Sequence, residues 1–373
     1  MQEKYTHFGV EVSLFSGKTR AYLRYKHIPF VEVTPSAKVI NKELYPQTGM
    51  RMIPVVKTPE GEYLQDTTDI IDKLEQRFPS HSVYPEQPLQ KFLAYLLELY
   101  ADEWLLLPAM HYRWHYKRDH LWFIMKEFGN CMMPSIPRIF RPFAACLPAL
   151  YFGRLYKPVL GVSKQNYRQV EAFYLRFLES FNKHLDSIPF VLGTRPSIAD
   201  FGFMGPLYAH LYRDPYSGKV MKTHAPNVAR WVERMNQLDT YDFGEDTGFE
   251  RGAQVAEHLV PILSQLQNDY YPILQETSER IAKRVKQKPN ERLPRFLGKM
   301  TFTLEGVEET RYVNTYAQWM WQRAINYFYG LSEAEQQIIR EALEAKGLSK
   351  LVAAPIKEQI ERRQNKLYPV NAK

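Results

Sequence analysis

The 373-residue chain contains only two cysteines, Cys131 and Cys146. So few cysteines exclude a disulfide framework and fit a reducing compartment. A CxxC pair, a glycine-rich phosphate loop and a GxSxG turn are also missing, so dithiol, nucleotide and serine-hydrolase chemistry lack support. The N-terminus is charged and polar, unlike a secretion signal. These absences predict a soluble, cytoplasmic protein.

Long apolar runs and long basic runs are absent as well. The most apolar stretch, residues 142–153, is too short and too interrupted by proline to cross a bilayer. The net charge is +8, but no five basic residues follow one another, so we expect no nucleic-acid binding.

Residues 137–157 are apolar with flanking Arg and Lys, and two interpretations remain for them. An interdomain or dimer contact is favoured over peripheral membrane attachment, so membrane contact is not expected.

Metal ligands are also scarce. His111 and His115 have the i, i+4 spacing that can bind zinc. However, the HExxH pattern is missing and no Cys or carboxylate partner is evident. We therefore predict no metal site.

The first eighty residues alternate between strand and helix patterns. Residues 10–15 alternate as a strand does, and the apolar spacing that follows predicts a helix over 16–27, with Ser16 as its N-cap. Further strands are predicted at 28–35 and in two parts of 50–66. A helix capped by a threonine is predicted over 67–78. The predicted order is βαβ followed by ββα.

The rest of the chain is predicted to be mostly helical. Ser197 and Asp200 form a variant capping box at the start of one helix, and Ser332 with Glu335 forms another. A short hairpin is expected over 299–313. The expected helices cover 88–128, 165–186, 196–211, 226–238, 251–287 and 314–329, with a last one from 332 to 346.

Four motifs occur in a fixed order: SGKTRAYLRYKHIPF at 16–30, MIPVV at 52–56, LQDTTDII at 64–71 and PSIADF at 196–201. In these motifs the chain resembles the glutathione transferase (glutathione S-transferase) family over roughly residues 8–240, and in particular bacterial-type members with a long C-terminal extension. The resemblance implies an α/β plus all-α fold. It consists of a thioredoxin-like glutathione-binding domain (8–82), an all-helical substrate domain (88–245) and a mostly helical extension (250–373).

The resemblance also implies a glutathione site. The bond between Ile53 and Pro54 is expected to be cis, since cis peptides are essentially a proline phenomenon, and the backbone beside it would pair with the tripeptide. Asp66 and Thr67 would bind the γ-glutamyl end of glutathione, the carboxylate taking its ammonium group and the hydroxyl with the helix start taking its carboxylate. Thr67 or Thr68 is also expected to cap the helix.

Ser16 aligns with the residue that sets the chemistry in the family. Its hydroxyl would donate to the glutathione sulfur and favour the thiolate, which is the nucleophile. Ser13 and Thr19 are nearby hydroxyls that a shift in the alignment would select, and Ser16 could also be a plain helix cap. Lys18 and Arg20 are expected to lie mainly on a solvated helix face.

The second substrate would bind near Met110 and Trp114, although core packing or a dimer interface is favoured for either residue taken singly. The function implied is activation of the glutathione thiolate for attack on a small hydrophobic electrophile, as in detoxification, by a homodimer that uses no metal. The alternative is a non-catalytic, transferase-like binding or scaffold protein whose extension binds a partner. The extension could also be a lid over the cleft or a helical addition packed on the helical domain.

Overall fold

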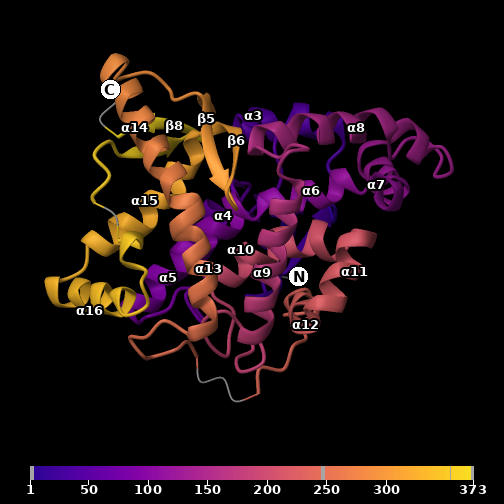
Figure 1. The fold of residues 1–373 in the computed structure, drawn as a ribbon. Coiled ribbons are helices and arrows are strands. Elements are labelled where there is room, and N and C mark those ends of the chain that lie inside the picture. The colour runs from indigo at the N-terminus through magenta and orange to yellow at the C-terminus, as the bar shows by residue number, and fades with distance from the viewer. Residues whose placement is uncertain (1–3, 245–247, 353, 371–373) are drawn as a thin grey trace. The chain divides into compact units, whose positions relative to one another are not determined.

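The computed structural model describes residues 4–244, 248–352 and 354–370, and the side chains of residues 147–150 and 152 are outside the description (Figure 1). The chain forms two compact units, each built from three stretches. Unit 1 comprises Met1–Val83, Pro108–Lys157 and Phe201–Asp242, and unit 2 comprises Tyr84–Leu107, Pro158–Asp200 and Phe243–Lys373. The units interleave along the chain, whereas the predicted domains follow one another; the predicted boundaries stay a prediction.

Unit 1 contains a four-stranded sheet with the order β2-β1-β3-β4. Strand β1 runs parallel to β2 and antiparallel to β3, which is antiparallel to β4. This is the predicted thioredoxin-like βαβ-ββα arrangement. The strands and their helices are β1 (Tyr5–Phe8), α1 (Leu14–Tyr25), β2 (Phe30–Val33), α2 (Ala37–Val39), α3 (Tyr45–Thr48), β3 (Val55–Lys57), β4 (Tyr63–Gln65) and α4 (Thr67–Arg77).

The predicted strand over 10–15 and the predicted helix start at Ser16 are both wrong. Strand β1 ends at Phe8, and α1 begins at Leu14, with Ser13 as its N-cap. The Ser13 hydroxyl accepts the backbone N–H of Ser16 at 3.4 Å. Val10 and Val12 lie in the turn between β1 and α1, and both side chains are buried. Their alternation in the sequence therefore resembles that of a strand.

The other helices that lie mainly in unit 1 follow from residue 106. The predicted helical region over 88–128 is confirmed, but a π-helical turn at Tyr100–Trp104 and a break at Tyr116 divide it. Apolar and aromatic residues on every side of this stretch conceal the breaks from periodicity. The helices are α6 (Leu106–His115), α7 (Lys117–Met132), α8 (Arg141–Leu160), α10 (Ile198–Pro206), α11 (Pro215–His224) and α12 (Pro226–Met235).

Unit 2 contains the remaining helices and two hairpins. The predicted hairpin near 299–313 is confirmed, and the predicted capping box of Ser332 and Glu335 starts α16. The final hairpin, β7–β8, was not predicted, because its short strands carry little alternation. The elements are α5 (Pro88–Leu99), α9 (Tyr167–His184), α13 (Val260–Gln265), α14 (Tyr271–Gln287), β5 (Phe296–Leu304), β6 (Val307–Asn314), α15 (Thr315–Tyr329), α16 (Glu333–Glu344), β7 (Ile360–Arg363) and β8 (Lys366–Pro369).

The C-terminal extension is part of the core of unit 2. Arg311 of β6 is 3% exposed, and its guanidinium lies 5.3 Å from the ring centre of Trp104. On α15, Arg323 binds the buried Glu98 of α5 at 2.7 Å. These contacts support the interpretation of the extension as an addition packed on the helical part of the chain. Among the described residues, no helix is long and apolar enough to cross a membrane.

Candidate functional site

The register of the sheet in unit 1 brings the ends of three strands to one edge. Phe8, the last residue of β1, pairs with Val55, the first residue of β3, and Val55 pairs with Gln65, the last residue of β4. The chain therefore leaves β1, enters β3 and leaves β4 at the same edge. The start of α1, Pro54 and Asp66 lie just beyond it.

The peptide bond between Ile53 and Pro54 is cis, as predicted. Pro54 is buried, and the half-buried Ile53 packs against the small apolar cluster of Phe8, Leu44 and Val55. The cis bond therefore sits on a packed base at the entry to β3.

Asp66, rather than Thr67 or Thr68, caps helix α4, so that part of the prediction is wrong. The Asp66 carboxylate accepts the backbone N–H groups of Thr68 at 3.1 Å and Asp69 at 3.4 Å. Its φ is 81°, a conformation that non-glycine residues rarely adopt. Because Asp66 is the cap, Thr67 lies in the first turn of the helix, where it is 5% exposed.

The two serines near the start of α1 have different surroundings. Ser16 is 0% exposed, and its hydroxyl accepts the backbone N–H of Val10 at 3.2 Å. Ser13 is only half-buried and stands at the helix N-cap. The Ser16 hydroxyl therefore closes the turn before the helix, and the Ser13 hydroxyl lies nearer to solvent.

Side chains from three other elements hold this turn in place. Glu11 accepts the Tyr208 hydroxyl at 2.5 Å and forms an ion pair with Arg20 at 3.3 Å. Burial and the Glu11 carboxylate raise the pKa of Tyr208 to about 12. Arg113 donates to the backbone oxygen of Val12 at 2.9 Å. The residues that lead to Ser13 are thus positioned before any ligand binds.

Lys18 and Arg20 are buried, which corrects the prediction that they lie on a solvated face. Lys18 is 0% exposed and donates to the Thr68 hydroxyl at 3.3 Å, which links α1 to the start of α4. Arg20 binds both carboxylate oxygens of Glu32 at 2.5 Å. Burial alone would raise the pKa of Glu32, but the hydrogen bonds and charge of Arg20 outweigh it and lower the pKa to about 2.

Arg113 is a positioning residue, whereas the helical spacing in the sequence had grouped it with the predicted second-substrate pocket. It is 2% exposed and donates to both oxygens of Asp214, each at 2.7 Å. It also donates to the backbone oxygen of Ala209 at 2.6 Å. In the sequence, Arg113 is marked only as an arginine in an aromatic helix. Its partner Asp214 lies 101 residues away, so no local pattern links the two.

Met110 and Trp114, predicted to line the second-substrate pocket, lie in an apolar cluster of unit 1. Trp114 is 4% exposed and packs with Ile124, with Met110 against them. A Cβ on Gly153 would lie 2.5 Å from the Trp114 ring, so α8 packs closely there. Core packing therefore accounts for Trp114, and the pocket assignment stays a prediction.

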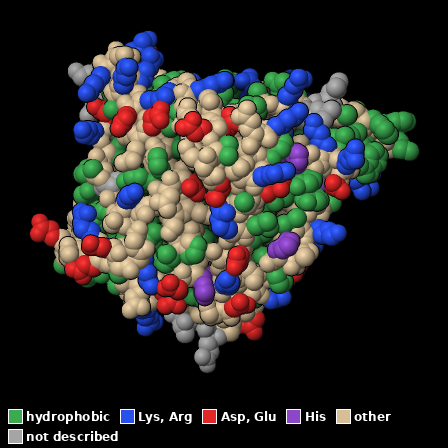
Figure 2. Space-filling view, in the orientation of Figure 1, with side chains coloured by type: hydrophobic (Ala, Val, Ile, Leu, Met, Phe, Trp, Pro, Cys, Tyr) green, Lys and Arg blue, Asp and Glu red, His purple; other side chains and the backbone are tan. Residues whose placement is uncertain are grey.

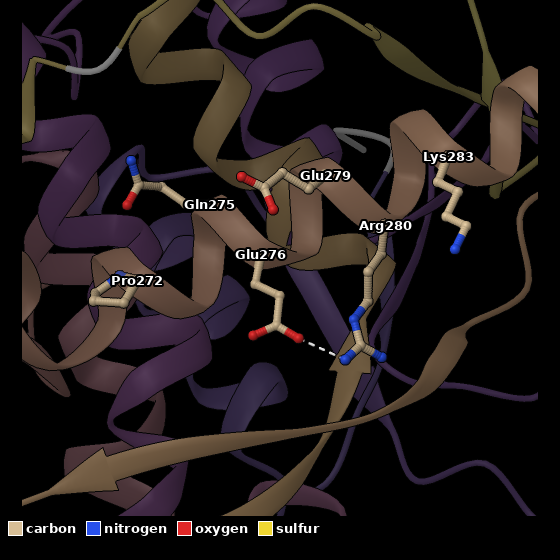
Figure 3. Close-up of a pocket in the computed structure, with 6 residues that line it drawn as sticks. All are labelled: Pro272, Gln275, Glu276, Glu279, Arg280 and Lys283. Carbon is tan, nitrogen blue, oxygen red and sulfur yellow. Dashed lines mark hydrogen bonds and ion pairs between the residues drawn. The ribbon is translucent and has the colours of Figure 1, made fainter.

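Two further observations concern metal ligands and a hollow in unit 2. Within the described ranges, no group of three or more His, Cys, Asp or Glu side chains could hold a metal ion. Figure 3 shows a hollow along one face of α14, in unit 2, where Arg280 pairs with Glu276 at 2.5 Å and also donates to the backbone oxygen of Leu297. None of the predicted site residues lines this hollow.

The sequence matches two family models. The N-terminal domain of glutathione S-transferase matches residues 8–82, and the C-terminal domain of glutathione S-transferase matches residues 132–239. A search of curated proteins found no match.

The solved structures that the chain matches share little sequence with it. A GST-like protein from Pseudomonas syringae is 21% identical, with a TM-score of 0.41 and coverage of 64% of this chain and 68% of that one. The glutathione transferase GSTFuA3 from Phanerochaete chrysosporium is 14% identical, with a TM-score of 0.44 and coverage of 64% of this chain and 99% of that one. A glutathione S-transferase from Methylobacillus flagellatus with glutathione bound is 17% identical, with a TM-score of 0.35 and coverage of 62% of this chain and 93% of that one.

The family assignment therefore rests on the two domain models together with the motifs and the sheet. The N-terminal match runs from the last residue of β1 past the end of α4 and includes the cis-proline, and the C-terminal match covers helices α8 to α12. The chain belongs to the glutathione S-transferase family.

Proposed function

We propose that the chain binds glutathione at the sheet edge beyond Phe8, Val55 and Gln65 and activates its thiolate for attack on a small hydrophobic electrophile. The observation that carries the proposal is the convergence at one edge of a cis-proline, a helix start with an acidic cap and a second helix start. Ile53 and Pro54 would pair with the extended tripeptide backbone. Glutathione is a substrate in this scheme.

The start of α4 suits the γ-glutamyl end of glutathione. That end carries an ammonium and a carboxylate group, so it needs an anion next to hydrogen-bond donors. Asp66 offers the anion, and the Thr67 hydroxyl beside it would offer a donor, since the Thr68 and Asp69 backbone N–H groups are already bonded to Asp66. The Asp66 carboxylate is already fixed by two backbone N–H groups, so its position does not depend on the ligand.

The start of α1 suits the thiol. A helix N-terminus favours negative charge and lowers the pKa of a nearby thiol. The family alignment proposes Ser16 as the hydroxyl donor to the sulfur. Because Ser16 is fully buried and bonded to Val10, we propose Ser13, the half-buried N-cap, as the residue that donates. Ser16 would then hold the turn that presents Ser13.

A matched pair of variants separates these assignments. Calorimetric titration with glutathione tests binding, and the ultraviolet absorbance of the bound thiolate against pH measures the thiol pKa. We expect Ser13→Ala to raise this pKa by about one unit, since losing a hydrogen bond to a charged group costs about 1.5 kcal/mol. We expect Ser16→Ala to leave it unchanged while lowering stability.

Two results would contradict the proposal at different levels. A thiol pKa that rises in Ser16→Ala and not in Ser13→Ala would restore the Ser16 assignment. Failure of millimolar glutathione to bind or to stabilise the intact protein would refute glutathione binding itself and favour the non-catalytic scaffold. If the wild type turns over a generic aryl electrophile, and this turnover is lost when the bound thiolate is lost, the chain is a glutathione-conjugating enzyme.

A further inference from the structure

Hydrophobic side chains are exposed together on the helical hairpin formed by α7 and α8 in unit 1. Of thirteen strongly exposed large hydrophobic side chains among the described residues, seven lie between 122 and 155, so exposure is concentrated there. We call these seven residues the apolar tip. They are Trp122, Met132, Ile139, Phe140, Phe143, Tyr151 and Leu155.

The apolar tip extends over both helices and the connection between them. Ile139 is 73% exposed, and Phe143 is 64% exposed. The rings of Trp122 on α7 and Phe143 on α8 meet edge to face at 5.9 Å, which joins the two helices. Figure 2 shows hydrophobic side chains gathered at the free end of this hairpin, with basic side chains around them. Isolated exposed apolar residues need no explanation, but a gathered patch marks an interaction surface.

The hairpin presents the tip rigidly. The Arg141 guanidinium donates to the backbone oxygens of Ile136 and Pro134, each at 2.7 Å, and so fixes the connection between the helices. Gly129 allows α7 and α8 to cross closely, because a Cβ there would lie 2.5 Å from the backbone oxygen of Arg141. The exposure of the tip therefore belongs to a fixed fold rather than to a loose loop.

The charge around the tip decides what it contacts. Residues 117–160 contain seven Lys and Arg and only two Asp and Glu, and Glu127 is paired with Arg213 at 2.7 Å. Arg138 and Arg154 are exposed, and neither forms an ion pair in the part of the chain that the structure describes. Two copies of such a face would repel each other, whereas an anionic lipid surface would attract it.

We propose that the apolar tip of α7 and α8 inserts into the interface of an anionic membrane, with Arg138 and Arg154 on the lipid headgroups. Aromatic side chains with basic neighbours are the composition that interfacial segments use. The segment 137–157 was expected to be a domain or dimer contact, and the excess of basic residues around its exposed apolar side chains is the reason for this revision. The protein would thus contact a membrane surface peripherally, and the proposal does not depend on glutathione binding.

Sedimentation of the full chain with vesicles tests the proposal. We expect binding to vesicles of phosphatidylcholine mixed with phosphatidylserine, and little binding to phosphatidylcholine alone. Each of Arg138→Gln and Arg154→Gln should weaken binding about fivefold, as expected for one basic residue near an anionic surface. The double variant Phe140→Ser/Phe143→Ser should weaken it at least about tenfold through lost apolar burial.

Matched substitutions elsewhere control for charge and hydrophobicity. Arg292→Gln removes an exposed arginine and Ile338→Ser an exposed apolar residue outside the hairpin, and both should bind vesicles as the wild type does. Lipids brominated on their acyl chains should quench tryptophan fluorescence in the wild type and less so in Trp122→Phe.

Two results would overturn the proposal. Equal vesicle binding by the wild type and the tip variants, or none by either, would show that the tip does not contact lipid. Sedimentation velocity that finds a wild-type dimer and monomeric tip variants, without vesicle binding, would assign the tip to an interface between two copies.

Discussion

The buried pair of Arg113 and Asp214 gives the sharpest test of how the turn before α1 is held. Arg113 is 2% exposed and Asp214 is 0% exposed, and two hydrogen bonds of 2.7 Å join them. Replacing Arg113 by Met keeps the length of the side chain and leaves the Asp214 carboxylate buried without its guanidinium. Removing one partner of a buried pair costs about 3–5 kcal/mol, so Arg113→Met should lower the free energy of unfolding by that amount.

A second variant distinguishes the unpaired charge from the loss of packing. Replacing both residues, in Arg113→Met/Asp214→Leu, removes the stranded carboxylate. In the described structure Asp214 makes no side-chain cap to α11, so no cap is lost. Because an apolar pair can replace a buried ion pair, the double variant should recover about 2 kcal/mol or more relative to Arg113→Met.

Urea unfolding of the wild type, both single variants and the double variant completes the cycle. The exposed pair of Lys183 and Glu179 is the control, and Lys183→Met should cost less than about 1 kcal/mol. A cost below about 1 kcal/mol for Arg113→Met, or a double variant no more stable than that single variant, would refute the idea that this pair anchors the turn.

Two further predictions concern unit 1. The pKa of Glu32 is lowered from 4.5 to about 2, so its pairing with Arg20 stabilises the fold above about pH 4.5 and is lost as the pH falls toward 2. Glu32→Gln should therefore destabilise the protein at neutral pH, and acid titration should show its stability converging with that of the wild type; a constant gap down to pH 2 would contradict this. Gly129→Ala should lower the melting temperature, since the added Cβ would lie 2.5 Å from the Arg141 backbone and overpacking costs about 1–3 kcal/mol. Gly252→Ala, with nothing within 4 Å, is its control, and equal melting temperatures would mean that the helix crossing relaxes freely.

Local patterns predicted much of the framework. The order of strands and helices around the sheet, the cis bond before Pro54 and the capping box at Ser332 all depend on residues close in sequence, and the structure contains each of them. The same patterns failed at residues 10–15. There, alternating apolar residues serve a buried turn, and periodicity does not distinguish the two uses.

By itself, the sequence determined the family fold and the stretch of chain on which a glutathione site would lie, because turn, cap and strand signals are local. Only the tertiary structure decided which hydroxyl near α1 is buried and that Lys18 and Arg20 are buried as well. It also decided that the apolar tip of α7 and α8 is exposed. Burial depends on partners far along the chain, such as Asp214 for Arg113 at a separation of 101 residues. No local pattern encodes such a partner, so exposure and charge pairing had to come from the fold.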